Sequence, residues 1–221
     1  MSSATITTSA RLMNSTPQTE EQAMVRKVAV SSFLGNFIEW FDYASYSYFA
    51  TTIALVFFPT DNHTVAMLQT FGVFALSFIL RPIGALFWGS YGDKKGRKAA
   101  LAHSIMFMSG ASFLIGCLPS YSVIGVGAPI LLLLLRMVQG FSASGEYAGA
   151  ATFLGEYAPT SKRGIYCSLI PASTAIGLLA GSTLATLMTA NMNSSAMVGW
   201  GWRVPFLLAG PLGLIVLYIR A

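Results

Sequence analysis

The chain has 221 residues, of which 54% are hydrophobic and only 10% are charged. A soluble domain is typically about 25% charged, so this composition indicates a membrane protein and argues against a soluble enzyme. The net charge of +5 does not indicate a nucleic-acid partner, because the basic residues stand in short clusters between apolar runs.

The first 25 residues form a polar segment rich in Ser and Thr. The segment lacks the apolar core of a signal peptide, and its composition is typical of disorder. We expect a disordered cytoplasmic tail over residues 1–25, followed by a six-helix transmembrane domain over residues 26–221.

The rest of the chain alternates between long apolar runs and short polar turns. A bilayer span needs about 20 mostly apolar residues. Runs of this kind lie at 28–57, 66–90, 99–119, 125–155, 164–190 and 203–219. The breaks have turn-forming sequences, among them PTDNHT, GDKKGR and PTSKRG. The sequence therefore predicts an all-α membrane protein with six transmembrane helices.

Lysine and arginine are distributed unevenly among the predicted turns. The segment before the first span and the turns after the second and fourth spans are basic, whereas the turns at 58–64 and 118–124 have neither residue. The fifth turn has only Arg203 at its far edge, and Arg220 closes the last span. Because cytoplasmic loops carry an excess of Lys and Arg, we expect both termini in the cytoplasm.

The first span contains two carboxylates, Glu39 and Asp42, in the stretch GNFIEWFDY. At helical spacing they share a polar stripe with Asn36 and two tyrosines. Inserting an acid at the middle of the membrane costs about 2.5–3.5 kcal/mol of free energy, whereas each large apolar residue favours insertion by only about 0.3–0.6 kcal/mol. The acids must therefore face other helices or water. We expect the other side of this helix to face lipid through Phe33, Leu34, Phe37, Ile38, Trp40 and Phe41.

Other spans hold further charged residues. Arg81 stands in the second span beside Pro82, and the fourth span contains Arg136 and Glu146. The run GFSASGEYAGA is rich in small residues, which let helices approach closely. Together these residues predict a polar cavity between helices, where a carboxylate binds and releases a proton as water access changes. That is the chemistry of a proton-coupled transporter, and ion pairs that only lock the bundle are the alternative.

The turn between the second and third spans reads GSYGDKKGRK, from Gly89 to Lys98. Its glycines permit a tight turn, and Asp93 is placed to cap the start of the third span. Its basic residues also fit a purely topological role on the cytoplasmic side.

Five segments together resemble one transporter family. They occur in order between about residues 26 and 220, and they read GNFIEWFDY, FILRPIGALFWGSYGD, RMVQGFSASGEYAGA, EYAPTSKRG and WGWRVPF. They are similar to the metabolite:proton symporter branch of the major facilitator superfamily, which includes permeases for proline and glycine betaine, 2-oxoglutarate, citrate and shikimate. The resemblance implies the N-terminal half of a major facilitator fold, built from two inverted three-helix repeats, in the bacterial inner membrane.

The resemblance also implies roles for two groups of residues. The implied cytoplasmic gate contains Gly89, Asp93, Gly96 and Arg97, with Glu156 as the partner of Arg97. The implied proton and substrate groups are Glu39, Asp42, Arg81, Arg136 and Glu146. The motifs do not settle which carboxylate carries the proton.

The function implied is proton-coupled symport of a small zwitterionic or carboxylate metabolite by alternating access, with osmolytes such as proline and glycine betaine favoured. Arginine suits a carboxylate, and Tyr43, Tyr46, Trp40 or Trp88 suit a quaternary ammonium through cation–π contacts. A dicarboxylate permease of the 2-oxoglutarate type and a non-transporting membrane fragment are the alternatives.

The expected partners are a small-molecule substrate, protons and the lipid bilayer. We expect no cofactor, metal site or enzyme activity, because the sequence has no hydrolase triad, zinc pattern or phosphate-binding glycine loop. Transporters of this superfamily have two six-helix halves, whereas this chain ends at Ala221 after the sixth predicted span. We expect a fragment that lacks the C-terminal half or, alternatively, a homodimer of halves.

Overall fold

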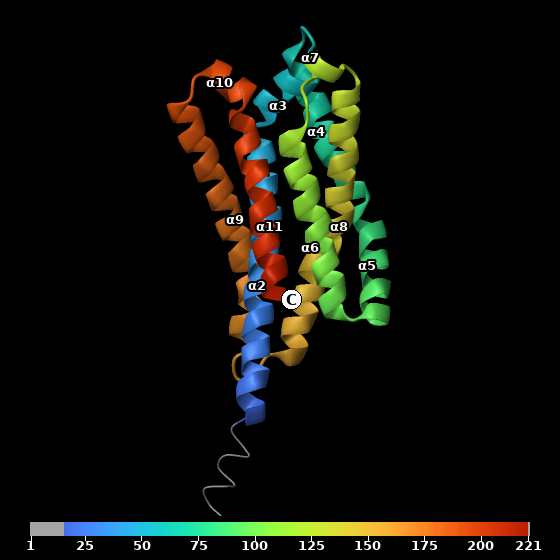
Figure 1. Cartoon of the computed structure of the whole chain (residues 1–221), viewed down its shortest axis with the longest axis vertical. Coiled ribbons are helices and arrows are strands. Elements are labelled where there is room, and N and C mark those ends of the chain that lie inside the picture. The colour runs from blue at the N-terminus through green and yellow to red at the C-terminus, as the bar shows by residue number, and fades with distance from the viewer. Residues whose placement is uncertain (1–15, 221) are drawn as a thin grey trace, which may run out of the picture.

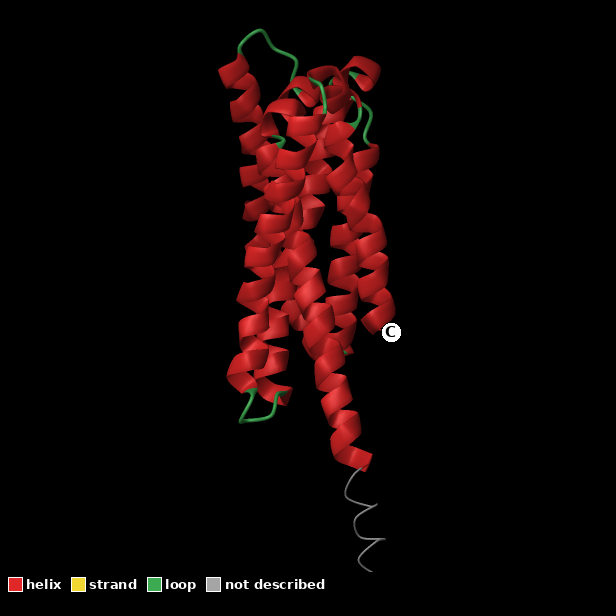
Figure 2. Ribbon diagram, turned by 90° about the vertical axis from the view of Figure 1, so that its left-hand side faces the viewer, coloured by secondary structure: helices red, strands yellow, loops and turns green. Residues whose placement is uncertain are grey.

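The computed structural model describes the backbone of residues 16–220, and the side chains of residues 25–219 other than 146, 148, 153, 156 and 157. Its elements are almost entirely helical (Figure 2). In chain order they are α2 (Thr16–Tyr48), α3 (Ala50–Phe57), α4 (His63–Ile79), α5 (Arg81–Lys95), α6 (Arg97–Cys117), α7 (Tyr121–Ile124), α8 (Gly127–Tyr157), α9 (Arg163–Asn191), α10 (Ser194–Gly199), the 3-10 helix η1 (Gly201–Arg203) and α11 (Val204–Arg220).

The long helices run along one axis, and the chain reverses direction at both ends of the bundle (Figure 1). The α5–α6 and α8–α9 connections lie at one end of the bundle, and both described ends of the chain point towards that end. The α3–α4 connection and the connections through α7 and α10 lie at the other end, whereas α4 passes into α5 within the bundle. The basic turns therefore gather at one end, as the distribution of Lys and Arg predicted. That this end faces the cytoplasm remains a prediction.

Five stretches of the described chain are long and apolar enough to cross a membrane, at His63–Lys95, Arg97–Cys117, Gly127–Thr152, Arg163–Asn191 and Gly201–Ile219. Their outer faces expose large apolar side chains, among them Leu86 and Leu214, and lipid is the natural contact for such faces. The first predicted span corresponds to α2 and α3. This span is not among the five stretches, because Asn36, Glu39 and Asp42 lower the mean hydropathy of α2.

Helix α2 begins at Thr16, inside the range 1–25 that we predicted to be a disordered tail. The sequence TPQTEEQA explains the extension, because proline is accommodated in a first helical turn and Glu, Gln and Ala are strong helix formers. Helix α2 therefore starts before residue 26, where we predicted the transmembrane domain to begin. Residues 1–15 lie outside the described residues.

The second predicted span, 66–90, consists of two helices that meet at Leu80. The break follows from Pro82, which lacks a backbone N–H and crowds the carbonyl one turn earlier. Helix α5 then continues to Lys95, so most of the predicted turn at 92–97 is helical. The chain reverses at Gly96, whose φ of 93° is a conformation that glycine adopts without strain.

Helix α2 is packed between other helices, chiefly α9, α11 and α8. Its expected lipid-facing side is covered: Ile38 and Phe41 are buried, and the other four apolar residues predicted there are only partly exposed. Helix α9 causes part of this covering, because a Cβ on its Gly177 would lie 2.8 Å from the Phe37 carbonyl oxygen. The prediction of a lipid-facing side was wrong, since helical spacing defines faces but not the neighbours that cover them.

Arg203, predicted at the far edge of the fifth turn, ties the end of α6 to η1. Its Nη1 donates hydrogen bonds to the carbonyl oxygens of Gly116 and Leu118, at 2.8 and 2.5 Å. These are terminal carbonyls of α6, where a cation is favourable. The adjacent Trp202 is fully buried between Phe57 and Phe206, so this end of the bundle is closed by a packed aromatic core.

Candidate functional site

Four of the five residues predicted as proton or substrate groups meet inside the bundle. Helix α2 supplies Glu39 and Asp42, the first residue of α5 is Arg81, and α8 supplies Arg136. Glu39 pairs with Arg81, and Asp42 pairs with Arg136. The fifth residue, Glu146, belongs to α8, but its side chain lies outside the described residues.

The Asp42–Arg136 pair is sealed from solvent. Nη1 of Arg136 lies 2.5 Å from Oδ2 of Asp42, and the two side chains are only 1% and 3% exposed. Gln139 donates to the other carboxylate oxygen at 3.1 Å and also to the hydroxyl of Ser112. The Arg136 guanidinium lies 3.9 Å from the centre of the Tyr46 ring. Both carboxylate oxygens of Asp42 therefore accept a hydrogen bond within a closed polar cluster.

The Glu39–Arg81 pair is less enclosed. Glu39 is 3% exposed, but the Arg81 side chain is 28% exposed. Nη2 of Arg81 donates both to Oε1 of Glu39 and to the hydroxyl of Tyr43. The break between α4 and α5 places Arg81 at this position, and its guanidinium also lies 4.8 Å from the centre of the Phe78 ring. This arginine is thus held by an acid on one side and by aromatic rings on the other.

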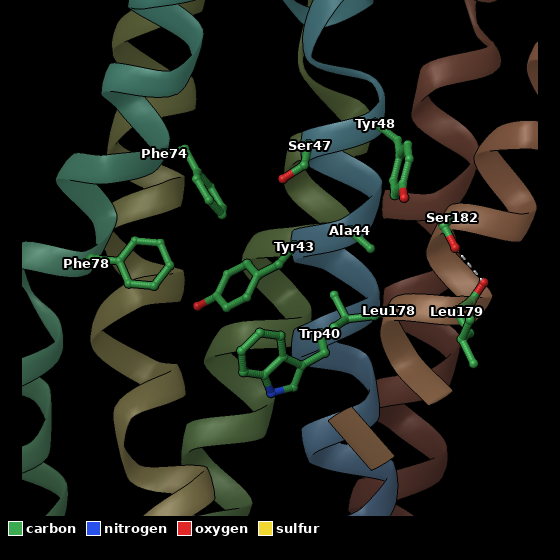
Figure 3. A pocket seen from close by; sticks show the side chains of 10 residues that line it. All are labelled: Trp40, Tyr43, Ala44, Ser47, Tyr48, Phe74, Phe78, Leu178, Leu179 and Ser182. Atoms are coloured by element: carbon green, nitrogen blue, oxygen red, sulfur yellow. Dashed lines mark hydrogen bonds between the residues drawn. The ribbon is translucent and has the colours of Figure 1, made fainter. Parts of the chain in front are cut away.

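Two cavities adjoin this second pair. The charged cavity, of about 490 Å³, is lined by Glu39, Trp40, Arg81, Pro82, Ala85, Ala143, Ser144 and Tyr147. The aromatic cavity, also of about 490 Å³, is lined by Trp40, Tyr43, Ala44, Ser47, Tyr48, Phe74, Phe78, Leu178, Leu179 and Ser182 (Figure 3). Trp40 belongs to both walls. The two cavities therefore meet at Trp40.

The predicted polar, close-packed face of α8 is present. Gln139, Gly140 and Ala143 are buried, whereas Tyr147 is 48% exposed. A Cβ on Gly140 would lie 1.9 Å from the carbonyl oxygen of Ser77 in α4. The expectation that small residues bring helices close together is therefore confirmed at this position.

The predicted gate residues lie at the α5–α6 connection. Asp93 occupies the last turn of α5 and pairs with Arg97 at 2.9 Å, across Gly96, with both side chains substantially exposed. Our expectation that Asp93 caps the third span was wrong, because α5 extends past Asp93 and the N-cap of α6 is Gly96. Gly89 and Arg97 line a small cavity of about 110 Å³. The side chain of Glu156 lies outside the described residues.

Sequence reasoning missed several residues of the site. Phe74 and Phe78 line the aromatic cavity, and their spacing from Arg81 follows the helical repeat, so a search for residues on the face of Arg81 would have found them. Ser112 reaches Gln139 from α6, and no sequence signal distinguishes it from the other serines of that helix.

Residues 27–221 match the family described as "Sugar (and other) transporter". The chain therefore belongs to this family of major facilitator transporters. The predicted family resemblance is confirmed on this point.

The chain is also similar to particular transporters. It is 44% identical over 200 residues to the glycine betaine/proline/ectoine/pipecolic acid transporter OusA of Dickeya dadantii, covering 90% of this chain and 40% of the relative. It is 42% identical to the proline/betaine transporter of Salmonella typhimurium with the same coverage, and 43% identical over 196 residues to a putative proline/betaine transporter of Staphylococcus aureus. The chain thus spans less than half the length of these relatives.

Solved structures support the fold. The proton:xylose symporter XylE bound to 6-bromo-6-deoxy-D-glucose matches with a TM-score of 0.78 at 16% identity, over 90% of this chain and 45% of XylE. A partially occluded inward-open form of XylE from E. coli also matches with a TM-score of 0.78, at 18% identity over 89% of this chain and 47% of XylE. At such identities the likeness concerns the fold, and it confirms the predicted half of a major facilitator fold.

Proposed function

We propose that this chain serves in proton-coupled symport of a small zwitterionic osmolyte, such as proline or glycine betaine, across the bacterial cytoplasmic membrane by alternating access. The observation that carries the proposal is the Glu39–Arg81 pair in the wall of the charged cavity. Ionisable residues at membrane depth are functional candidates by default. The names of the relatives, which are proline and betaine transporters, support the choice of substrate.

The pair suggests how a proton and a carboxylate substrate are coupled. While Glu39 is ionised, it occupies Arg81 and competes with a substrate carboxylate. A proton on Glu39 removes that competition and leaves Arg81 able to bind the substrate carboxylate through charge-assisted hydrogen bonds. Proton and substrate then favour each other's binding by the same factor, because linkage is reciprocal.

The difference in access between the two arginines favours a zwitterion over a dicarboxylate. Arg136 is 1% exposed and engaged by Asp42, whereas Arg81 lines the charged cavity. A dicarboxylate is best bound by two accessible cations, and of this pair only Arg81 reaches a described cavity. A substrate with one carboxylate and one cationic group matches this arrangement better.

The residues at the α5–α6 connection are proposed as the inside gate. Asp93 and Arg97 form an exposed ion pair across the tight turn at Gly96. An exposed pair is weak, so it can break and re-form as the helices move between states. The orientation that places this end in the cytoplasm is part of the proposal and rests on the basic turns gathered there.

Uptake tests the proposal directly. The 221-residue chain is expressed in bacteria that lack their own osmolyte and dicarboxylate permeases, and membrane insertion is verified first. Uptake of labelled proline and glycine betaine is expected to collapse when a protonophore is added. Uptake of labelled 2-oxoglutarate instead would support the dicarboxylate alternative, and no uptake by a well-inserted chain would overturn transport by this chain on its own.

The Glu39→Gln variant tests the coupling residue. We expect it to insert normally and to lose proton-coupled uptake, because the amide cannot take up the proton that frees Arg81. The matched control is Asp61→Asn, an acid in the exposed turn between α3 and α4, and this variant should retain uptake. Normal uptake by Glu39→Gln would reject Glu39 as the coupling group.

A further inference from the structure

The aromatic cavity and the charged cavity meet at Trp40 and differ in their lining. We infer that the aromatic cavity is the subsite for an N-methylated ammonium group, and that the substrate carboxylate binds Arg81 in the adjoining charged cavity. This inference rests on the proposed function and deepens it. It places the cationic group of the substrate in the aromatic cavity and its carboxylate in the charged cavity.

Four aromatic rings gather on one side of the aromatic cavity (Figure 3). Trp40 and Tyr43 come from α2, and Phe74 and Phe78 come from α4. The ring centre of Tyr43 lies 5.8 Å from that of Trp40, 5.5 Å from that of Phe74 and 5.6 Å from that of Phe78. The Tyr43 ring meets those of Trp40 and Phe74 at 83° and that of Phe78 at 37°. A cation in the cavity can therefore contact the faces or edges of more than one ring.

The polar groups of the aromatic cavity select the kind of cation. Its lining contains hydroxyl groups, from Ser47, Tyr48 and Ser182 among others, but none of its lining residues is acidic. The Ser182 hydroxyl already donates to the carbonyl of Leu179. A primary ammonium has three N–H donors that need acceptors, whereas a trimethylammonium has none and binds aromatic faces. The cavity therefore suits a methylated ammonium better than a primary one.

The proposed carboxylate anchor, Arg81, lies over two of these rings. The guanidinium of Arg81 lies 5.2 Å from the centre of the Tyr43 ring and 4.8 Å from that of Phe78. The Tyr43 hydroxyl also accepts a hydrogen bond from Arg81, so this tyrosine takes part in both walls. Such closeness fits substrates whose carboxylate and ammonium are separated by a single carbon, as in glycine betaine.

Binding to the purified full chain in lipid nanodiscs tests the inference by isothermal titration calorimetry. The probes are glycine betaine and 3,3-dimethylbutyrate, which has the same shape and carboxylate but carbon in place of the charged nitrogen. We expect glycine betaine to bind at least about tenfold more tightly, because only its cation gains from the aromatic rings. Equal affinities, or no betaine binding by a helical and monodisperse chain, would overturn the inference.

The Phe78→Leu variant tests the rings themselves. It should weaken betaine binding about tenfold and weaken binding of 3,3-dimethylbutyrate clearly less, since for that probe only the contact of the ring with Arg81 is lost. Phe78→Tyr keeps the π face and should restore betaine binding, which separates loss of the ring from loss of packing. The matched control is Phe71→Leu, a similarly exposed phenylalanine of α4 that does not line the aromatic cavity. Equal effects of Phe78→Leu and Phe71→Leu would reject the subsite.

Uptake and binding separate this inference from the proposed function. Protonophore-sensitive betaine uptake that Phe78→Leu leaves unchanged would preserve the transport proposal and reject the subsite. Betaine binding that Phe78→Leu weakens, in a chain without uptake, would preserve the subsite and reject transport by this chain on its own.

Discussion

Glu39 and Asp42 of α2 each pair with an arginine of another helix, and the two pairs differ mainly in their access to solvent. Asp42 and Arg136 are almost completely buried within a cluster completed by Gln139. Glu39 is equally buried, but its partner Arg81 reaches the charged cavity. Two acids one turn apart on α2 thus have partners in different environments, because Arg136 is enclosed whereas Arg81 lines a cavity.

The difference arises from the helices that carry the arginines. Helix α8 approaches α4 so closely at Gly140 that a Cβ there would lie 1.9 Å from the Ser77 carbonyl oxygen. The adjacent Gln139 and Arg136 are buried beside this contact. Arg81 instead begins a new helix beside Pro82, at the break in the second span. Close packing seals one pair, and a broken helix leaves the other beside a cavity.

The largest expected effect is at the sealed pair. Asp42→Asn leaves the charge of Arg136 buried without a counter-charge, which typically costs about 3–5 kcal/mol. Thermal unfolding of the purified chain should show this loss. The double variant Asp42→Asn with Arg136→Gln should recover much of it, because it removes the uncompensated charge. A double variant that is no more stable than the single one would contradict the conclusion that Asp42 and Arg136 are buried as a pair.

The helix contact that encloses this pair should be the next most sensitive. Gly140→Ala places a methyl group against the Ser77 carbonyl, and such overpacking costs about 1–3 kcal/mol. Gly110→Ala in α6 is the control, since a Cβ there meets no atom within 4 Å, and it should be neutral or stabilising. Equal unfolding temperatures for the two variants would contradict the close α4–α8 contact.

Glu39→Gln should have a smaller effect on stability than Asp42→Asn. Arg81 keeps its hydrogen bond to Tyr43 and its partial exposure, so the variant is expected to lose no more than about 1–2 kcal/mol. Comparing the unfolding midpoints of these two variants tests the ranking directly. A greater loss at Glu39 would reverse the roles assigned to the two pairs.

The smallest stability effect is expected at the α5–α6 connection. The Asp93–Arg97 pair is exposed, and exposed pairs contribute about 0–1 kcal/mol. Asp93→Asn should therefore unfold like the unmodified chain, while uptake reveals any role in gating. A marked fall in the unfolding temperature would show that this pair holds the helices together.

The sequence predicted the helices better than their contacts. The third and fifth spans, expected at 99–119 and 164–190, correspond to α6 and α9 within two residues at each end, because long apolar runs and turn residues are local signals. Glu39 and Asp42 were correctly placed on one face with Asn36. Which arginine each acid contacts could not be predicted, since that depends on how separate helices pack.

Other errors have the same origin. Pro82 was a local signal for the break in the second span. The extension of α5 past Asp93 had no such signal, because it depends on the chain reversing direction at Gly96. The covered side of α2 was mistaken for a lipid-facing side, because the same pattern of apolar residues is found whether a helix or lipid covers them. The aromatic cavity requires α2 and α4 side by side, which no local pattern specifies.

The most direct test of the comparison is the accessibility of two matched serines. Ser144 lines the charged cavity, whereas Ser112 is fully buried beside Gln139. Each is changed to cysteine in a background where Cys117 and Cys167, both free in the structure, are replaced by serine. A hydrophilic thiol reagent should label Ser144→Cys readily, more slowly with glycine betaine present, and should leave Ser112→Cys unlabelled. Equal labelling of both positions would contradict the distinction between an accessible and a sealed pair.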